Sequence, residues 1–275
     1  MEIVDTHIHV WTAEDPTYPM YIEPGKYPWW KGTTTEYIAE KEEAGIDRAV
    51  IVQIPYHRYD HSYALEARRR FPSVFAIVGL LDVHDVEATT EIERLLREDS
   101  IQGIRLSPGN EPWLDAKPTV AIGMAAEALG VPVIVQIRPG QYDRFARLAA
   151  SCRNTVFALD HIGGAALTGE SAGEFSRLLA LSMHPNICVK TSHLYGLDRS
   201  PEEEAAIPAA LERLRKAFGA ERLMFGSNWP LVRSFGGLKR CVDGFCEAIS
   251  GFTAEEQRLV LGGTARKLYR WERDG

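Results

Sequence analysis

The chain is poor in cysteine and in basic charge, and each shortage excludes a class of protein. Four cysteines in 275 residues are too few for a disulfide framework, so we expect reduced thiols that pack in the interior. The 31 basic side chains are outnumbered by 38 acidic ones, which gives a net charge of −7. A chain of this charge repels the phosphate backbone, so nucleic acid is not an expected partner.

Long apolar runs are also missing. No segment approaches the roughly 18 apolar residues of a membrane span, and the start of the chain has acidic residues where a signal peptide needs basic ones. No phosphate-binding loop, dinucleotide fingerprint, EF-hand or zincin motif occurs either. We therefore expect a cytoplasmic protein that has no membrane partner and acts on a small molecule.

The sequence does contain a slow alternation between short apolar runs and longer amphipathic stretches. The apolar runs are residues 3–8, 49–54, 74–81, 101–106, 131–137, 156–159, 187–190 and 223–226. Near-continuous hydrophobicity is typical of parallel strands that are buried on both faces. The amphipathic stretches are residues 34–44, 62–71, 86–97, 119–129, 141–150, 173–183, 201–218 and 254–269. Eight strand-then-helix units without a linker predict an α/β fold, a single-domain (β/α)₈ TIM barrel over residues 1–275.

The ends of two predicted strands carry histidines. His7 and His9 are two residues apart, so in a strand they project to the same side and can bind one metal ion together. His161 follows the sixth strand at the same end of the barrel, where the active sites of such barrels lie. These three residues are the predicted catalytic and metal-binding histidines, with zinc or manganese as the expected ion.

Six segments resemble one family and occur in its order. They are residues 5–9 (DTHIH), 52–54 (VQI), 103–106 (GIRL), 160–164 (DHIGG), 189–192 (VKTS) and 223–230 (LMFGSNWP). Together they are similar to the amidohydrolase superfamily, in particular to its branch of sugar lactonases and pyrone-dicarboxylate lactonases. The resemblance implies a barrel hydrolase that opens a lactone with water. Barrels of this kind often form dimers, so we keep a homodimer as an expectation.

Asn228 departs from the family pattern, because an aspartate stands at this position in the family. A neutral amide can coordinate a metal weakly but cannot act as a general base. Three alternatives follow. The three histidines hold a metal that activates water, or the site is metal-free and a group such as His193 takes the proton, or the barrel only binds its ligand. The superfamily adds a fourth alternative, a decarboxylase.

Further polar residues lie near the predicted strand ends and are the expected substrate-binding groups. They are Gln53, Arg105, Gln136, Lys190, His193 and Tyr195. Arg105 and Lys190 directly follow buried strands, so their charges must point into the barrel mouth or find a buried partner. Cations that converge in a chain of charge −7 favour an anionic substrate. We expect a carboxylated or polyhydroxylated lactone.

An aromatic, proline-rich insertion of residues 11–33 follows the first strand. We expect Trp30 in this insertion and Trp229, next to Asn228, to line the substrate pocket. Asp5 is expected to orient one of the histidines rather than to react itself.

Overall fold

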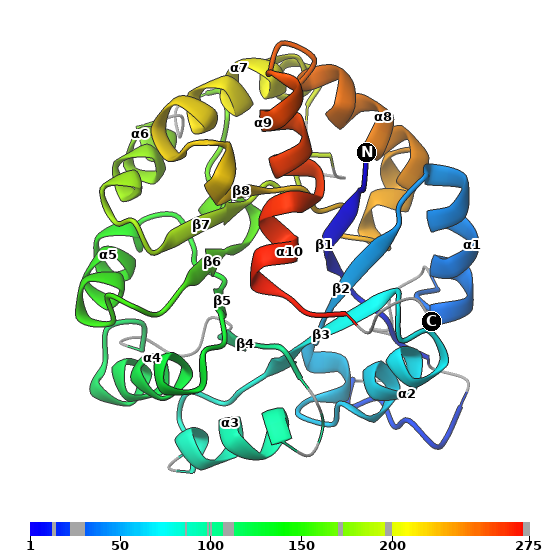
Figure 1. The fold of residues 1–275 in the computed structure, drawn as a ribbon, viewed down its shortest axis with the longest axis vertical. Helices are drawn as coiled ribbons and strands as arrows, with labels where there is room; N and C mark the ends of the chain where they lie inside the picture. The colour runs from blue at the N-terminus through cyan, green and yellow to red at the C-terminus, as the bar shows by residue number, and fades with distance from the viewer. Residues whose placement is uncertain are drawn as a thin grey trace.

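Eight parallel strands follow one another around a barrel in chain order (Figure 1). The structure is a computed structural model, and it describes residues 1–12, 15–22, 31–85, 87–97, 99, 101–106, 113–169, 173–195 and 200–271. The strands are β1 (Val4–Ile8), β2 (Arg48–Val52), β3 (Phe75–Leu80), β4 (Gly103–Leu106), β5 (Val133–Val135), β6 (Phe157–Leu159), β7 (Ile187–Lys190) and β8 (Leu223–Met224). An isolated bridge joins Ile8 to Trp229, so the sheet closes on itself. The predicted single-domain (β/α)₈ barrel is confirmed.

Helices surround the strands in the same order. They are α1 (Thr34–Ala44), α2 (Ser62–Arg70), α3 (Ala88–Arg97), α4 (Lys117–Leu129), α5 (Tyr142–Ser151), α6 (Gly173–Ala180), α7 (Pro201–Phe218), α8 (Leu238–Ala248), α9 (Ala254–Arg258) and α10 (Thr264–Leu268). Residues 254–268 are helical, as predicted, but they are not the helix that follows β8 in the barrel; α8, which the sequence pattern did not predict, takes that place. Its interior Gly244 disfavours a helix by about 1 kcal/mol relative to alanine. A Cβ at Gly244 would lie 3.2 Å from the ring of Tyr195, so packing explains why glycine stands there.

The segment with α9 and α10 closes one end of the barrel. Ala265 and Tyr269 pack with the apolar side chains of the barrel interior, among them Val4, Val50 and Met224. The helices α9 and α10 are joined by a π-helical turn, Leu259–Gly263, and Val260 of this turn accepts a hydrogen bond from the backbone N–H of Phe225. This end lies at the start of β1, so the opposite end, where the strands finish, is the one left for a site.

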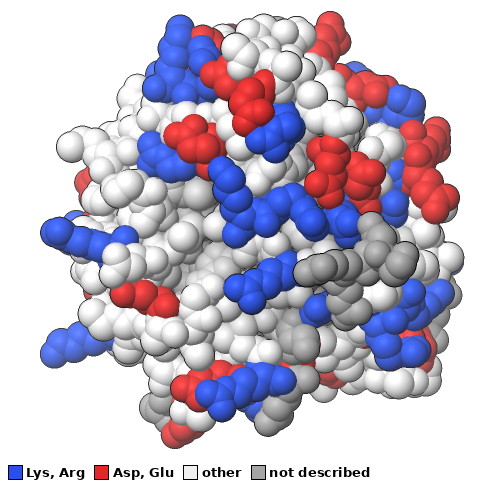
Figure 2. All heavy atoms as spheres, viewed as in Figure 1, with Lys and Arg blue, Asp and Glu red and all other residues white. Residues whose placement is uncertain are grey.

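Charge is unevenly distributed over the surface. From the viewpoint of Figure 1, α10 crosses the middle of the barrel, and Figure 2 shows Lys and Arg side chains in a band across the middle of the same face. The net charge of −7 is therefore no guide to the local charge of one face. Among the described residues, no helix combines the length and the apolar character needed to cross a bilayer.

Candidate active site

His7 in β1 and His9 directly after it converge on one point. His9 Nδ1 lies 2.7 Å from the carbonyl oxygen of Val52 on β2, and His7 Nδ1 lies 3.1 Å from Asp160 Oδ1 beyond β6. A carbonyl and a carboxylate only accept hydrogen bonds, so each Nδ1 must carry the ring proton. Both Nε2 atoms then present lone pairs, and they lie 3.2 Å apart.

This arrangement suits a metal ion. Burial lowers the pKa of His9 to about 3, and it also holds the pKa of His7 well below its usual value, so both rings are neutral near pH 7. Two facing lone pairs at this distance repel unless a cation lies between them. Two nitrogens bound to one zinc ion in tetrahedral geometry are about 3.4 Å apart, close to the separation found here.

Asp160 is the central charge of the site, and the sequence reasoning did not assign it a role. It contacts His7, and it forms ion pairs with Arg105 (Nε to Oδ2, 3.3 Å) and Lys190 (Nζ to Oδ1, 3.4 Å). Burial by itself would raise its pKa, but His7, Lys190 and Arg105 together hold it well below the usual value. The signal was present in the sequence, since Arg105 and Lys190 lie within buried strands, β4 and β7, and their charges need a buried anion.

His161 reaches the site from a left-handed turn. Residues 161–164 have φ values of 53°, 48°, 64° and 72°, although the first two are not glycine. The Oγ of Ser192 lies 2.9 Å from His161 Nδ1 and accepts a hydrogen bond from its backbone N–H. Possible ligand atoms of His7, Asp160 and His161 all lie within 4.8 Å of one another, so these three residues could share an ion.

Gly163 is expected to be essential to this turn. Its φ is +64°, and a Cβ there would lie 2.9 Å from Cε1 of Tyr142. The Gly163→Ala substitution should lower the free energy of unfolding by about 3 kcal/mol, because a left-handed alanine and an overlap with a ring both cost energy. Gly130→Ala is the matched control, since Gly130 has a φ of +66° and open space around it. Urea denaturation should show a loss of only about 1 kcal/mol for the control, and equal losses would disprove the packing argument.

Asn228 and His193 form a pair beside the histidines. The amide Nδ2 of Asn228 lies 2.9 Å from His193 Nδ1, and its backbone N–H donates to the carbonyl oxygen of His7. Asn228 and His193 both have a positive φ, 62° and 63°. In this orientation the amide donates to Nδ1, so the proton of a neutral His193 lies on Nε2. Neither side chain is then placed to take a proton from water.

Asp5 supports the site in a different way from the one predicted. It accepts hydrogen bonds from the backbone N–H groups of Ser227 and His7, at 2.8 and 3.2 Å, and from the Ser227 hydroxyl. It therefore ties the backbone of β1 to the segment after β8 and does not orient an imidazole. Burial raises the pKa of Asp5 to about 6.

A cavity of about 430 Å³ opens at the barrel mouth above these groups. Six predicted residues line it: His9, Arg105, Gln136, His161, His193 and Asn228. His7 and Lys190 lie deeper and are fully buried. Sequence reasoning missed other lining residues: Trp11, Ile54, Pro55, Tyr56, Ile137, Gly164 and Leu231.

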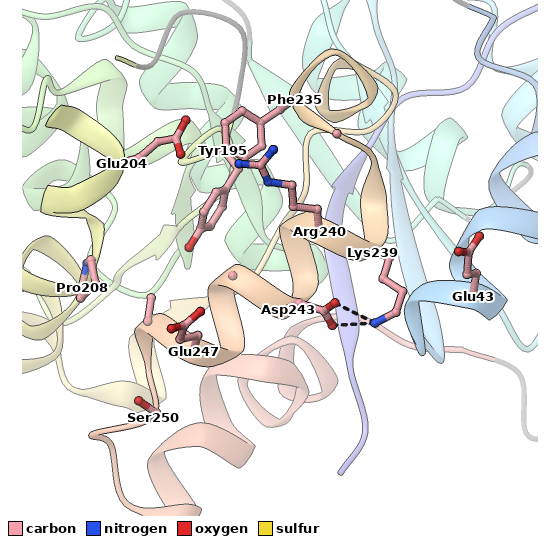
Figure 3. Close-up of a pocket in the computed structure, with 13 residues that line it drawn as sticks. Glu43, Tyr195, Glu204, Pro208, Phe235, Lys239, Arg240, Asp243, Glu247 and Ser250 are labelled. Atoms are coloured by element: carbon pink, nitrogen blue, oxygen red, sulfur yellow. Dashed lines mark hydrogen bonds and ion pairs between the residues drawn. The ribbon is translucent and has the colours of Figure 1, made fainter. Parts of the chain in front are cut away.

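Besides Lys190, four predicted substrate-binding residues are not among those that line this cavity. Tyr195 points into a groove between α7 and α8 on the outside of the barrel (Figure 3). Trp229 is fully buried, and its Nε1 donates to Glu40. The side-chain amide of Gln53 donates hydrogen bonds to two backbone carbonyl oxygens of the following loop. The backbone carbonyl oxygen of Gln53 accepts a hydrogen bond from Arg105. Trp30 lies outside the described residues.

The (β/α)₈ barrel and the three histidines that line its mouth are the features of a TIM-barrel enzyme. The family model described as Amidohydrolase matches residues 4–271, and the chain therefore belongs to the amidohydrolase family. The resemblance read from the sequence is confirmed.

Three comparisons give the range of the similarity. The chain is 25% identical to L-fucono-1,5-lactonase of Burkholderia ambifaria, covering 98% of this chain and 96% of that protein. It is 26% identical to 4-sulfomuconolactone hydrolase of Rhizobium radiobacter, covering 82% and 75%. A crystal structure of an amidohydrolase from Burkholderia multivorans with bound zinc is 21% identical, with a TM-score of 0.83 over 99% of this chain and all of that chain. This last likeness shows the shared fold.

Proposed function

We propose that the protein is a hydrolase that opens a lactone ring with water. The observation that carries the proposal is the pair of neutral histidines whose Nε2 lone pairs meet 3.2 Å apart at the barrel mouth. Two curated relatives, a fuconolactonase and a sulfomuconolactone hydrolase, support lactones as the substrate class. In the reaction, the water oxygen bonds to the carbonyl carbon, the ring C–O bond breaks, and the released oxygen takes a proton to give a hydroxy acid.

We propose further that a divalent metal, zinc or manganese, is held by His7 and His9 with His161 and Asp160. Asp160 Oδ2 is buried and lies 3.3 Å from Arg105 Nε, but no hydrogen bond from the described residues reaches it, so a lone pair is left for a ligand role. When bound, such an ion lowers the pKa of water to about 7. Another way to activate the water is needed because neither Asn228 nor His193 is oriented to act as a base.

The remaining lining residues bind and orient the substrate. Among the described residues that line the cavity, Arg105 is the one cation and none is acidic. Asp160 is one negative charge paired with two positive ones, Arg105 and Lys190, so a net positive charge remains. Arg105 therefore favours a substrate that carries a carboxylate. The amide oxygen of Asn228 remains as an acceptor that can position the water.

A pH-indicator assay tests the function. The purified protein is offered a panel of lactones, and metal content is measured by elemental analysis of protein purified without chelator. Hydrolysis releases a proton for each ring opened, whereas decarboxylation releases carbon dioxide. Absence of acidification with every lactone, from protein that holds one metal ion per chain, would reject the proposal. Full activity in metal-free protein would reject the metal and leave the lactonase.

Asn228→Asp tests the departure from the family pattern. We expect kcat/KM for a carboxylated lactone to fall by about 10-fold or more, because a new carboxylate in the cavity that Arg105 lines repels the carboxylate of the substrate. Asn154→Asp adds the same charge at an exposed position and should change kcat/KM by less than about twofold. Steady-state kinetics checks both variants, and a gain of activity in Asn228→Asp would show that the asparagine impairs catalysis.

A further inference from the structure

The cavity wall that follows β8 is fastened to a helix on the outside of the barrel. Asn228 and Leu231 line the cavity, and Trp229 between them is fully buried. The indole Nε1 of Trp229 donates to Oε2 of Glu40, 2.9 Å away, and Glu40 belongs to α1. A buried indole N–H that is left without a partner costs free energy. The position of Trp229 is therefore tied to one side chain of α1.

The sequence of α1 directs Glu40 toward the barrel. Tyr37 is fully buried, and its ring meets that of Trp229 edge to face, with the centroids 5.1 Å apart. Residues three apart in a helix lie on the same face, so Glu40 follows Tyr37 toward Trp229. Glu42, two positions further along, is exposed. Glu40 thus lies on the inner face of α1 and Glu42 on the outer face.

Arg233 joins Glu40 and Trp229 from the other side. Its Nε lies 2.7 Å from Oε1 of Glu40, and its guanidinium carbon lies 4.8 Å from the centre of the Trp229 ring. The side chains of Glu40 and Arg233 are 28% and 22% exposed, so water screens this ion pair less than a pair on the open surface. Both carboxylate oxygens of Glu40 are therefore used to hold the segment after β8.

The backbone of Trp229 carries this connection into the site. Its carbonyl oxygen accepts a hydrogen bond from the N–H of His9 at 2.8 Å, and the N–H of Asn228 donates to the carbonyl oxygen of His7 at 2.9 Å. Asn228 has a left-handed φ of 62°, and its amide Nδ2 lies 2.9 Å from His193 Nδ1. A residue other than glycine keeps this conformation only where its surroundings impose it. A displacement of Trp229 would move the amide of Asn228 and the backbone of His9 together.

We infer that Glu40 is a positioning residue of the active site, which holds Asn228 in place through the side chain of Trp229. The inference rests on the proposed lactonase function, in which the amide oxygen of Asn228 positions the water. Glu40 is not one of the residues that line the cavity, so it acts on the reaction through geometry alone.

Glu40→Met tests the inference, because methionine is a good helix former of similar size and lacks both acceptor oxygens. We expect kcat for the lactone that the parent protein hydrolyses fastest to fall by about 10-fold, with KM within about threefold, because a small displacement of Asn228 misplaces the water. Glu40→Gln restores an acceptor for the indole and should keep kcat within about threefold of the parent. Glu42→Ala is the control on the outer face and should change kcat by less than about twofold. Full kcat in Glu40→Met, or an equal loss in Glu40→Gln, would overturn the inference.

Amide hydrogen exchange separates positioning from a general loss of stability, and it needs no substrate. Mass spectrometry should show exchange about 10-fold faster in residues 7–9 and 226–229 of Glu40→Met and unchanged in α4 and α5. An equal acceleration throughout the barrel would indicate a merely structural role and overturn the inference. If the parent protein hydrolyses no lactone, the proposed function fails, and hydrogen exchange still decides whether Glu40 holds Asn228.

Trp229→Phe removes the same hydrogen bond from its other end, and it takes the place of Glu40→Met if that variant does not fold. Its kcat should also fall by about 10-fold. The double variant Glu40→Met with Trp229→Phe should stay within about twofold of the less active single variant, because both changes break one interaction. Losses that multiply would show that Glu40 acts by a route other than Trp229 and would overturn the inference.

Discussion

The His9→Ala protein is expected to lose its divalent metal and to lose lactone hydrolysis by a factor of about 1,000 or more. His9 contributes one of two Nε2 lone pairs that meet 3.2 Å apart. Its Nδ1 proton is fixed by Val52, so the lone pair cannot move to the other nitrogen. Removal of the ring leaves His7 without its partner. Elemental analysis and steady-state kinetics on the same preparation measure both effects.

His84→Ala is the control for this prediction. His84 is exposed and does not line the cavity, yet its removal also takes one histidine from the chain. Metal content and kcat should both stay within about twofold of the parent protein. If His9→Ala kept its metal and its activity, the assignment of the β1 histidines as the metal site would be wrong.

The Asp160→Asn substitution is expected to lower the free energy of unfolding by about 3–5 kcal/mol. Asp160 is the buried anion for Arg105 and Lys190, whose side chains are 4% and 0% exposed. A neutral amide would leave two buried cations without a counter-charge, and it would no longer hold the Nδ1 proton of His7 as strongly. Urea denaturation measures the loss as a lower midpoint with an unchanged slope.

Two further variants separate charge from packing in this prediction. Asp115→Asn removes a partly exposed partner of Arg147 and should cost less than about 1 kcal/mol. The double variant Asp160→Asn with Lys190→Met should recover part of the loss, because one of the two unpaired cations is gone. If the double variant were less stable than Asp160→Asn alone, the buried charge that Lys190 is left with would not be the cause of the loss.

Much of the fold could be predicted because its signals are local. Strands buried on both faces appear as short apolar runs, and each of the eight predicted runs overlaps one strand of the barrel. The missed helix, α8, shows the limit of this approach. Gly244 weakens its helical pattern, and the reason for that glycine is the ring of Tyr195, which is distant in sequence.

In the candidate site, too, residues that follow a local pattern could be predicted and the others could not. Spacing of two placed His7 and His9 on one side of β1, and six predicted residues line the cavity. Side chains in a loop do not alternate regularly, so the sequence does not show which way each one points. Tyr195 turns to the outside of the barrel and Trp229 into the core, while Trp11 and Tyr56 line the cavity without a sequence signal that marks them.

The sequence by itself determined the barrel, the family and the strand ends that carry histidines, since these depend on short-range periodicity and on ordered motifs. Only the tertiary structure decided what those histidines can do. The ring proton of His7 is fixed by Asp160, 153 positions away, and that of His9 by Val52, 43 positions away. Hydrogen bonds between distant strands set the direction of each lone pair, and no local pattern records them.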